Sequence, residues 1–172
     1  TASISVNENT SAVTTVTSTD ADASATATYS ISGTDVNDFM IDSSSGVLTF
    51  APSSPNFEVP TDSDENNTYI VDIIVTDNGA LTDSQTITIT VVNVNEAPVI
   101  TSNGGGATAS ISVNENTSAV TTITATDADA SAAATYSISG TDADDFTIDS
   151  SSGLLTFTSS PNFELPTDSD EN

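Results

Sequence analysis

The sequence predicts an all-β protein built from tandem Greek-key β-sandwiches of seven strands each, with the second sandwich incomplete in this chain. Three observations lead to this prediction. Apolar residues alternate with polar ones in short segments, turn residues separate these segments, and the whole pattern starts again in the C-terminal half. Alternation with a period of two is typical of strands that bury one face. Seven short strands at this spacing are typical of a sandwich of about 100 residues.

The first half of the chain supplies the strands in order. Ile4 and Val6 alternate with serines in the first strand, and Tyr29 and Ile31 alternate in the third. Threonine, which suits strand positions, is abundant throughout. Turn pairs, such as Ser45-Gly46 between the fourth and fifth strands, separate neighbouring segments. We expect strands near residues 2–6, 12–19, 27–32, 38–42, 46–51, 68–76 and 83–93.

The sixth and seventh expected strands carry the clearest alternation. Their apolar positions are Tyr69, Val71, Ile73, Val75, Ile87, Ile89 and Val91. Threonines occupy the positions between the apolar residues of the seventh strand, so we expect them to face solvent. These two strands therefore carry a large share of the apolar residues of the first sandwich.

An internal repeat sets the domain organisation. Residues 1–9 recur unchanged as residues 108–116, and a period of about 107 residues is the size of a domain. We expect a complete repeat over residues 1–98 and a partial repeat over residues 99–172, with only the first five strands. The stretch Gly104-Gly105-Gly106 after the junction fits either a surface turn or an interdomain hinge.

The partial repeat lacks counterparts of the two most apolar strands. Asn172 aligns with Asn66, and nothing in the second repeat matches the strands near 68–76 and 83–93. Each buried apolar side chain contributes about 1.5–3 kcal/mol, and a domain has a net stability of about 5–15 kcal/mol. We therefore expect outside strands to complete this repeat. They would come from the continuation of a longer polypeptide or from another molecule that donates a strand.

Charge and composition exclude several classes of function. The 172 residues include 25 Asp and Glu but no Lys, Arg, His or Cys. No side chain can neutralise a phosphate, so neither nucleic acid nor an anionic membrane is a partner. A Ser-His or Cys-His nucleophile, a Schiff base and a zinc cluster are all impossible. A glycosidase needs two carboxylates in a cleft, which a small sandwich does not offer, so we expect no enzyme.

Acidic and amide residues recur at the ends of the expected strands. In chain order these motifs are Glu8-Asn9, Asp20-Ala21-Asp22, Asn56-Phe57-Glu58, Val75-Thr76-Asp77 and Asn93-Val94-Asn95-Glu96-Ala97-Pro98. Their oxygens are the ligands that calcium prefers. In this order and spacing the motifs resemble those of the cadherin repeat, in its bacterial cadherin-like form. The resemblance covers essentially the whole chain and implies a cadherin-like sandwich with Ca²⁺ between successive domains.

The resemblance implies a specific set of calcium ligands. At the junction of the two repeats they are Glu8, Glu58, Asn93, Val94, Asn95, Glu96, Ala97, Asp127 and Asp129, with Val94 and Ala97 contributing backbone carbonyls. Asn56 and Asn93 stand where the family usually has aspartate, and Glu96 replaces a shorter acid. The two amides remove two negative charges. We therefore expect fewer ions per junction than in animal cadherins, or more weakly bound ones, with dissociation constants near the roughly 10⁻⁴–10⁻³ M of extracellular calcium modules.

Two further groups of acids are expected to be half-sites towards neighbouring domains. Asp20, Asp22 and Asp77 would face a preceding domain, and Glu115 and Glu164 would face a following one. We expect Asp35, Asp38, Asp72 and Asp83 to form solvated faces. Whether the acidic loop at residues 62–66 holds an ion of its own stays open.

The function implied is that of a non-enzymatic structural segment in a long, calcium-rigidified extracellular repeat protein, such as a bacterial surface adhesin or fibre. Its partners would be neighbouring repeats of the same or an identical chain, through shared calcium sites and strand completion. The alternative is a carbohydrate-binding module of a secreted polysaccharide-degrading enzyme, with polysaccharide as partner. That alternative needs exposed aromatic residues, but the chain has no Trp, and we expect its Tyr and Phe residues to lie in the core.

Overall fold

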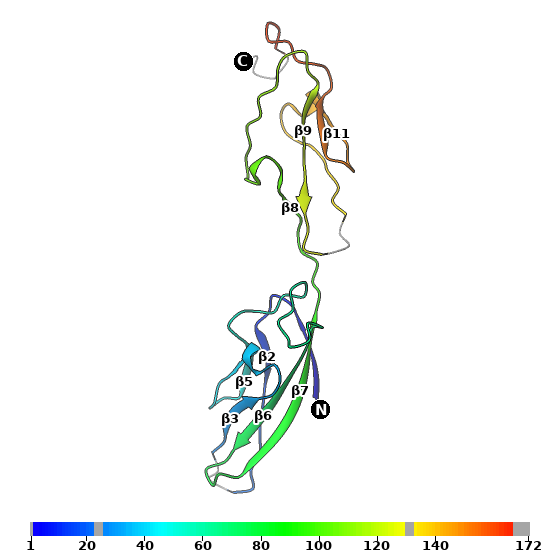
Figure 1. The fold of residues 1–172 in the computed structure, drawn as a ribbon. Coiled ribbons are helices and arrows are strands. Elements are labelled where there is room, and N and C mark those ends of the chain that lie inside the picture. The colour runs from blue at the N-terminus through cyan, green and yellow to red at the C-terminus, as the bar shows by residue number, and fades with distance from the viewer. Residues whose placement is uncertain (1, 23–25, 130–132, 167–172) are drawn as a thin grey trace. The chain divides into compact units, whose positions relative to one another are not determined.

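The computed structural model of the chain describes residues 2–22, 26–129 and 133–166 (Figure 1). It divides into two compact units, Thr1–Val94 and Asn95–Asn172. We call them unit 1 and unit 2. The regular structure in the described residues consists of strands and three short 3-10 turns, η1 (Val36–Asp38), η2 (Ser102–Gly104) and η3 (Ala143–Asp145). The protein is therefore all-β, as the alternating pattern predicts. None of the described segments is a helix long and apolar enough to cross a membrane.

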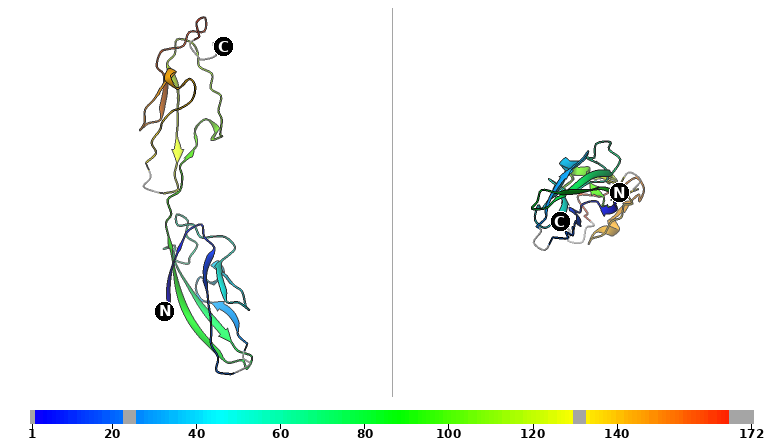
Figure 2. Two further views of the ribbon diagram at one scale, coloured as in Figure 1. Left: turned by 180° about the vertical axis from the view of Figure 1, so that it is seen from behind. Right: turned by 90° about the horizontal axis from the view of Figure 1, so that it is seen from below.

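Unit 1 is a sandwich of two sheets. Its strands are β1 (Ala2–Asn7), β2 (Ala12–Thr15), β3 (Thr28–Ser32), β4 (Phe39–Ile41), β5 (Val47–Phe50), β6 (Thr68–Thr76) and β7 (Thr82–Val92). One sheet has the order β1-β7-β6-β3 and the other has the order β2-β5-β4. β1 runs parallel to β7, and every other pairing in unit 1 is antiparallel. Figure 2 shows these strands from two further sides.

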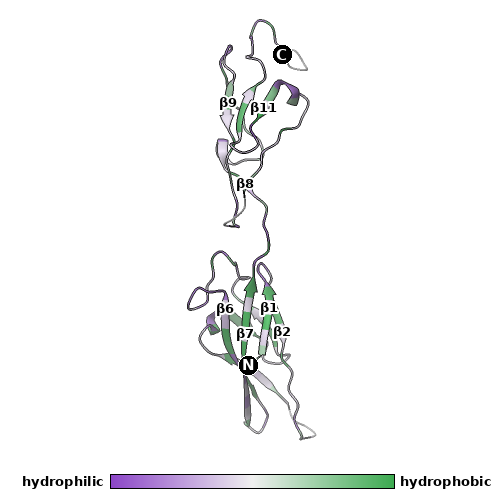
Figure 3. Cartoon of the chain, turned by 90° about the vertical axis from the view of Figure 1, so that its right-hand side faces the viewer, coloured by the Kyte–Doolittle hydropathy of each residue, from purple (hydrophilic) through white to green (hydrophobic). Residues whose placement is uncertain are grey.

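The hairpin of β6 and β7 forms the middle of the larger sheet. It pairs Thr68 with Thr90 at one end and Thr76 with Thr82 at the other. The alternate residues of β6 and β7 that face inward are almost fully buried, and those between them are more exposed. Figure 3 shows the apolar stretches of β1 and β7. The hairpin therefore supplies most of the core, as its alternation indicates.

Three aromatic rings join the two sheets of unit 1. The ring centroids of Phe39 and Phe50 lie 4.6 Å apart. Tyr69 meets both rings edge-on, at 5.9 Å from Phe39 and 5.2 Å from Phe50. Edge-to-face contacts of this kind add to the stabilisation from burial. The side chain of Tyr69 has no exposed surface, because β6 lays it across the rings of β4 and β5.

The second strand of unit 1 is shorter than expected. We expected it to extend to about residue 19, but β2 ends at Thr15. The ladder with β5 stops at the pair Thr15 and Val47, and the next residue, Val16, donates its N–H to the carbonyl of Gly46. Gly46 has φ +72°, and a Cβ atom at this position would collide with the Val16 carbonyl. The turn before β5 therefore ends the pairing.

Within its described residues, unit 2 repeats one of the two sheets. Its strands are β8 (Val99–Ile100), β9 (Ala119–Thr122), β10 (Ala125–Thr126), β11 (Phe146–Ile148) and β12 (Leu154–Phe157). The order β11-β12-β9 matches β4-β5-β2 of unit 1, and β10 pairs with β8. The 3-10 turn η2 and the left-handed Gly105 follow β8. The glycine-rich stretch therefore forms a turn.

Two expected strands of the second repeat are absent from the described residues. Residues 109–114 have the sequence of β1, and residues 135–139 have the sequence of β3, yet neither segment forms a strand. In unit 1 these sequences pair with β7 and β6. Unit 2 has no counterpart of either partner among its described residues. The expectation of five strands in the second repeat was therefore wrong for the first and third, because a strand requires a paired neighbour.

Candidate metal centre

The first candidate ligand, Glu8, is a buried carboxylate at the end of β1. It is only 2% exposed. Its Oε1 accepts a hydrogen bond from the N–H of Val94 at 2.8 Å, and its Oε2 accepts one from the N–H of Phe57 at 3.0 Å. A turn follows directly at Asn9, whose φ is +60°. The carboxylate is thus held in one orientation by two distant segments of unit 1.

Glu58 and Asn93 lie beside this carboxylate. The side-chain N–H of Asn93 donates to Oε1 of Glu58 at 2.9 Å. Among the residues that the structure describes, the other oxygen of Glu58, Oε2, is buried and has no hydrogen-bond partner. A buried acceptor without a partner is costly. Oε2 of Glu58 is therefore available as a ligand.

Asn56 organises the loop that carries Glu58. Its Oδ1 accepts hydrogen bonds from the N–H groups of Glu58 at 2.8 Å and Val59 at 3.2 Å. An amide oxygen forms this local turn as well as a carboxylate does. The asparagine at this position therefore keeps the loop shape while removing one negative charge.

The charges in unit 1 favour the binding of a cation. One carboxylate oxygen of Glu8 lies within 4.8 Å of one carboxylate oxygen of Glu58. Two like charges at this distance repel each other, more strongly when they are shielded from water. The sequence has no Lys, Arg or His to balance them. A hard cation with oxygen ligands fits this group of residues.

The candidate ligands of unit 2 also form a connected group. Oδ1 of Asp127 accepts a hydrogen bond from the N–H of Asp129 at 3.0 Å, and Oδ2 of Asp129 accepts one from the N–H of Glu96 at 2.9 Å. The side chain of Asn95 donates to the carbonyl of Glu96 at 2.9 Å. Ala97 follows in the same segment. The structure thus brings together Glu8, Glu58, Asn93 and Val94 in unit 1, and Asn95, Glu96, Asp127 and Asp129 in unit 2.

The expected half-sites repeat parts of this geometry. The N–H of Asp22 donates to Oδ1 of Asp20 at 2.8 Å, which matches the bond between Asp129 and Asp127. Asp20 and Asp77 line one small cavity of about 130 Å³. Oδ1 of Asp77 also accepts the N–H of Leu81 at 2.7 Å, so this acid shapes the turn between β6 and β7.

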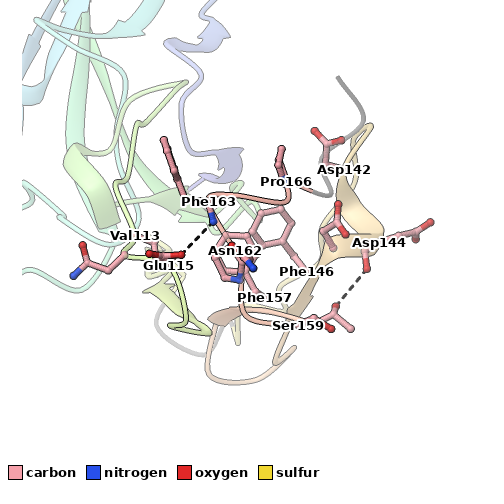
Figure 4. A pocket seen from close by; sticks show the side chains of 14 residues that line it. Val113, Glu115, Asp142, Asp144, Phe146, Phe157, Ser159, Asn162, Phe163 and Pro166 are labelled. Carbon is pink, nitrogen blue, oxygen red and sulfur yellow. Dashed lines mark hydrogen bonds between the residues drawn. The ribbon is translucent and has the colours of Figure 1, made fainter. Parts of the chain in front are cut away.

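The second expected half-site consists of Glu115 and Glu164 in unit 2. Oε2 of Glu115 accepts the N–H of Phe163 at 3.3 Å (Figure 4), as Glu8 accepts that of Phe57. The N–H of Glu164 donates to Oδ1 of Asn162 at 3.0 Å. The glutamate and loop arrangement of unit 1 therefore recurs in unit 2, although Glu115 is exposed and Glu8 is buried.

Sequence reasoning missed two buried acids in unit 1. Asp35, which we expected on a solvated face, is only 4% exposed and accepts the N–H groups of Ser63 and Ile70 at 2.8 and 2.7 Å. Asp62 is 2% exposed and accepts those of Asn66 and Asn67 at 2.8 and 3.1 Å. Their hydrogen bonds hold the acidic loop in place. Nothing in the local pattern distinguishes them from surface acids, because their donors depend on the tertiary fold.

The aromatic residues of unit 1 do not form a sugar-binding platform. Phe39, Phe50 and Tyr69 are among its most buried side chains. The hydroxyl of Tyr69 accepts the N–H of Thr61 at 3.1 Å. These rings therefore belong to the core, and their arrangement gives the carbohydrate-binding alternative no support.

Comparison with known proteins identifies the domain type. The family model described as the cadherin domain matches residues 2–94. A search of curated protein sequences finds no match. Among solved structures, the human protocadherin-24 fragment EC1-2, form II, has a TM-score of 0.62 and 22% identity, covering 96% of this chain and 78% of that chain. Mouse cadherin-23 EC22-24 has a TM-score of 0.50 and 27% identity, covering 99% of this chain and 53% of that chain.

The family match covers more than half of the chain, and the solved cadherin structures share its fold. Cadherin domains are extracellular, non-enzymatic modules with structural and adhesive roles, and they generally bind Ca²⁺. The chain therefore belongs to the cadherin domain family.

Proposed function

We propose that this chain is a structural segment of a long extracellular repeat protein that calcium rigidifies, such as a bacterial surface adhesin or fibre. Near-identical repeats and threonine-rich strands suit a spacer of this kind. In this proposal residues 1–98 form one repeat and residues 99–172 form part of the next. The partners are neighbouring repeats of the same or an identical chain.

We assign the calcium site to the junction of the two repeats. The proposed ligands are Glu8, Glu58, Asn93, Val94, Asn95, Glu96, Ala97, Asp127 and Asp129. Bound calcium would neutralise the clustered carboxylates and connect oxygen atoms from both repeats. Val94, whose N–H contacts Glu8, is separated from Glu96 by one residue, and an extended chain advances only about 3.3 Å per residue. Chain connectivity alone therefore keeps these ligands close.

The pair Glu8 and Glu58 is the observation that carries the proposal. Glu8 is buried and oriented by two backbone N–H groups. Glu58 presents a buried oxygen with no hydrogen-bond partner among the described residues. No basic residue in the sequence can compensate the two charges. A cation bound between them would compensate both charges and would coordinate the free oxygen of Glu58.

The remaining acids are proposed as halves of sites shared with other repeats. Asp20, Asp22 and Asp77 would serve the junction before unit 1. Glu115 and Glu164 would serve the junction after unit 2. The cavity that Asp20 and Asp77 share, and the hydrogen bond that Glu115 accepts from Phe163, support this assignment.

A calorimetric titration with Ca²⁺ tests the proposal. We expect binding with a dissociation constant of roughly 10⁻⁴–10⁻³ M, as in other extracellular calcium modules. Glu8→Gln and Glu58→Gln should each weaken binding about tenfold, since each removes one charged ligand. Asp83→Asn is the matched control, because Asp83 is exposed in β7 and is not among the proposed ligands, and this variant should bind like the unmodified chain. Absence of calcium-dependent heat, or equal loss in the control, would contradict the assignment.

A further inference from the structure

The turn between β6 and β7 contains one of the two Asn-Gly pairs of the sequence, Asn78-Gly79. The N–H of Ala80 donates to the carbonyl of Asp77 at 3.2 Å, and the N–H of Asp77 donates to the carbonyl of Leu81 at 3.0 Å. Residues 78–80 therefore form a three-residue hairpin loop, in which Ala80 takes the left-handed conformation with φ +63°. The Asn-Gly pair lies at the tip of the central hairpin of unit 1.

The two members of this pair are placed to react with each other. Both are exposed. Among the described residues, neither the side chain of Asn78 nor the N–H of Gly79 makes a hydrogen bond. Glycine has no Cβ atom that could shield its backbone nitrogen. Three carbon atoms of Asn78 join its own Cγ to that nitrogen, Cγ being the third, through Cβ, Cα and the carbonyl carbon, so a bond between Cγ and the nitrogen closes a small ring.

The second Asn-Gly pair, Asn103-Gly104, is held in a different way. The hydroxyl of Thr121 donates to Oδ1 of Asn103 at 3.1 Å, which ties this side chain to β9. Asn103 has φ +52° and Gly104 has φ +89°, so both residues take left-handed conformations. In the part of the chain that the structure describes, Asn78 has no comparable anchor. The fold therefore restrains one Asn-Gly pair more than the other.

We propose that Asn78 is a site of spontaneous deamidation, with water as the co-reactant. The nitrogen of Gly79 attacks Cγ of Asn78, and the new bond closes a succinimide ring. The bond from Cγ to Nδ2 breaks, and the side-chain amide leaves as ammonia with the proton that the Gly79 nitrogen loses. Water then adds to either carbonyl of the ring and opens it, which leaves aspartate or isoaspartate at position 78.

The product changes both the charge and the backbone of the hairpin tip. A neutral amide becomes a carboxylate beside Asp77, in a chain without Lys, Arg or His. The isoaspartate form also adds a methylene group to the backbone within the loop that the hydrogen bond from Ala80 to Asp77 closes. Oδ1 of Asp77 accepts the N–H of Leu81 at 2.7 Å, so the orientation of this acid depends on the same turn. The reaction does not depend on the calcium sites proposed above.

The test incubates the full chain at mildly alkaline pH and follows both pairs by peptide mass spectrometry. Chymotrypsin is used for digestion, because the chain has no Lys or Arg for trypsin to recognise. Methylation by an isoaspartyl methyltransferase detects the isoaspartate form. We expect deamidation to accumulate several-fold faster at Asn78 than at Asn103. In concentrated urea the two sites should react at similar rates, because the fold no longer distinguishes them.

Variants at the hairpin tip identify the reacting atoms. Asn78→Gln should stop the reaction, since the longer side chain must close a larger and less favoured ring. Gly79→Ala should slow it several-fold by shielding the nitrogen. Alanine is compatible with this turn, because the φ of Gly79 is not left-handed and the added Cβ atom would lie 3.3 Å from Oδ1 of Asp77, which needs only a small shift.

Thr121→Val is the matched control for the restrained pair. It removes the hydrogen bond to Asn103, while valine suits a strand position. The rate at Asn103 should therefore rise, and the rate at Asn78 should stay the same. The proposal is overturned by an Asn78 that stays intact in the folded chain while it reacts in urea. Equal rates at Asn78 and Asn103 in the folded chain would also overturn it, because the hairpin tip would then confer no selectivity.

Discussion

The N–H of Val94 donates a hydrogen bond of 2.8 Å to the carboxylate of Glu8, which joins the end of the last strand of unit 1 to the end of its first. The same carboxylate accepts the N–H of Phe57 at 3.0 Å. One buried acid thus orders three segments that lie far apart in the sequence. It has a structural role in addition to the metal-binding role proposed for it.

Glu8→Ala should therefore destabilise unit 1 even when a chelator removes calcium. The substitution leaves two backbone N–H groups without their acceptor, so we expect a loss of about 2 kcal/mol or more in the free energy of unfolding. Urea denaturation in the presence of chelator measures this loss. Glu65→Ala, at an exposed loop position, should change the midpoint little. An unchanged midpoint for Glu8→Ala would show that the two hydrogen bonds carry no stability.

Chelation should loosen the junction without unfolding unit 1, because the proposed ligands lie at the ends of the repeats and the core residues lie between them. Small-angle X-ray scattering should show a less extended particle after calcium is removed, while circular dichroism stays unchanged. Asp127→Asn and Asp129→Asn should reproduce this change in the presence of calcium. Asp83→Asn, at an exposed position of β7, should not. Identical scattering profiles with and without chelator would contradict the role of calcium at the junction.

The two repeats allow one substitution to be compared in two environments. Phe50 is 5% exposed beneath Tyr69, so Phe50→Ala should lower the free energy of unfolding of unit 1 by about 3–5 kcal/mol. The equivalent Phe157→Ala should cost unit 2 about half of this or less, because Phe157 is only half-buried. Denaturation followed by hydrogen exchange measures each unit separately. Equal costs would mean that unit 2 is closed over Phe157 in solution.

The turn between β4 and β5 should make stability depend on pH. The Ser44 hydroxyl, together with the Ser45 N–H and hydroxyl and the Ser44 N–H, donates to the carboxylate of Asp42 and lowers its pKa. Because the pKa of Asp42 is lower in the folded state than its usual value of 3.8, the charged carboxylate stabilises the fold at pH values above 3.8. This stability is lost as the pH falls through the folded-state pKa. Asp42→Asn should therefore lower the melting temperature at about pH 6, and the difference should shrink at about pH 3.

Asp64 makes the stability of unit 1 depend on pH in the opposite direction. Its hydrogen bond with Asp62 raises the pKa of Asp64, so its contribution is present at low pH and is lost as the pH rises through the raised value. Asp64→Asn should remove this dependence and stabilise unit 1 more at about pH 6 than at about pH 3. Melting curves at both pH values, compared with those of Asp42→Asn, separate the two effects. Parallel shifts for both variants would contradict the opposite signs.

Much of the fold follows from local pattern. The alternation of Tyr69, Val71 and Ile73 is sufficient to predict both the strand β6 and its buried face. The resemblance of the acidic motifs to those of the cadherin repeat implies that Glu8, Glu58 and Asn93 meet at one end of a repeat. The structure brings these three residues together through hydrogen bonds. Such features depend on period and order along the chain, which the sequence displays directly.

Other features were decided by tertiary structure alone. Asp35 looks like a surface acid in the sequence, but the N–H groups of Ser63 and Ile70, from distant segments, allow it to be buried. The six residues of β1 form a strand, whereas the identical residues 109–114 do not. A strand is stable only when a neighbour satisfies its backbone hydrogen bonds. In unit 1 that neighbour is β7, whose paired residues lie 85 positions further along the chain. The local sequence therefore determines the preference for a strand, and the distant partner determines whether it forms.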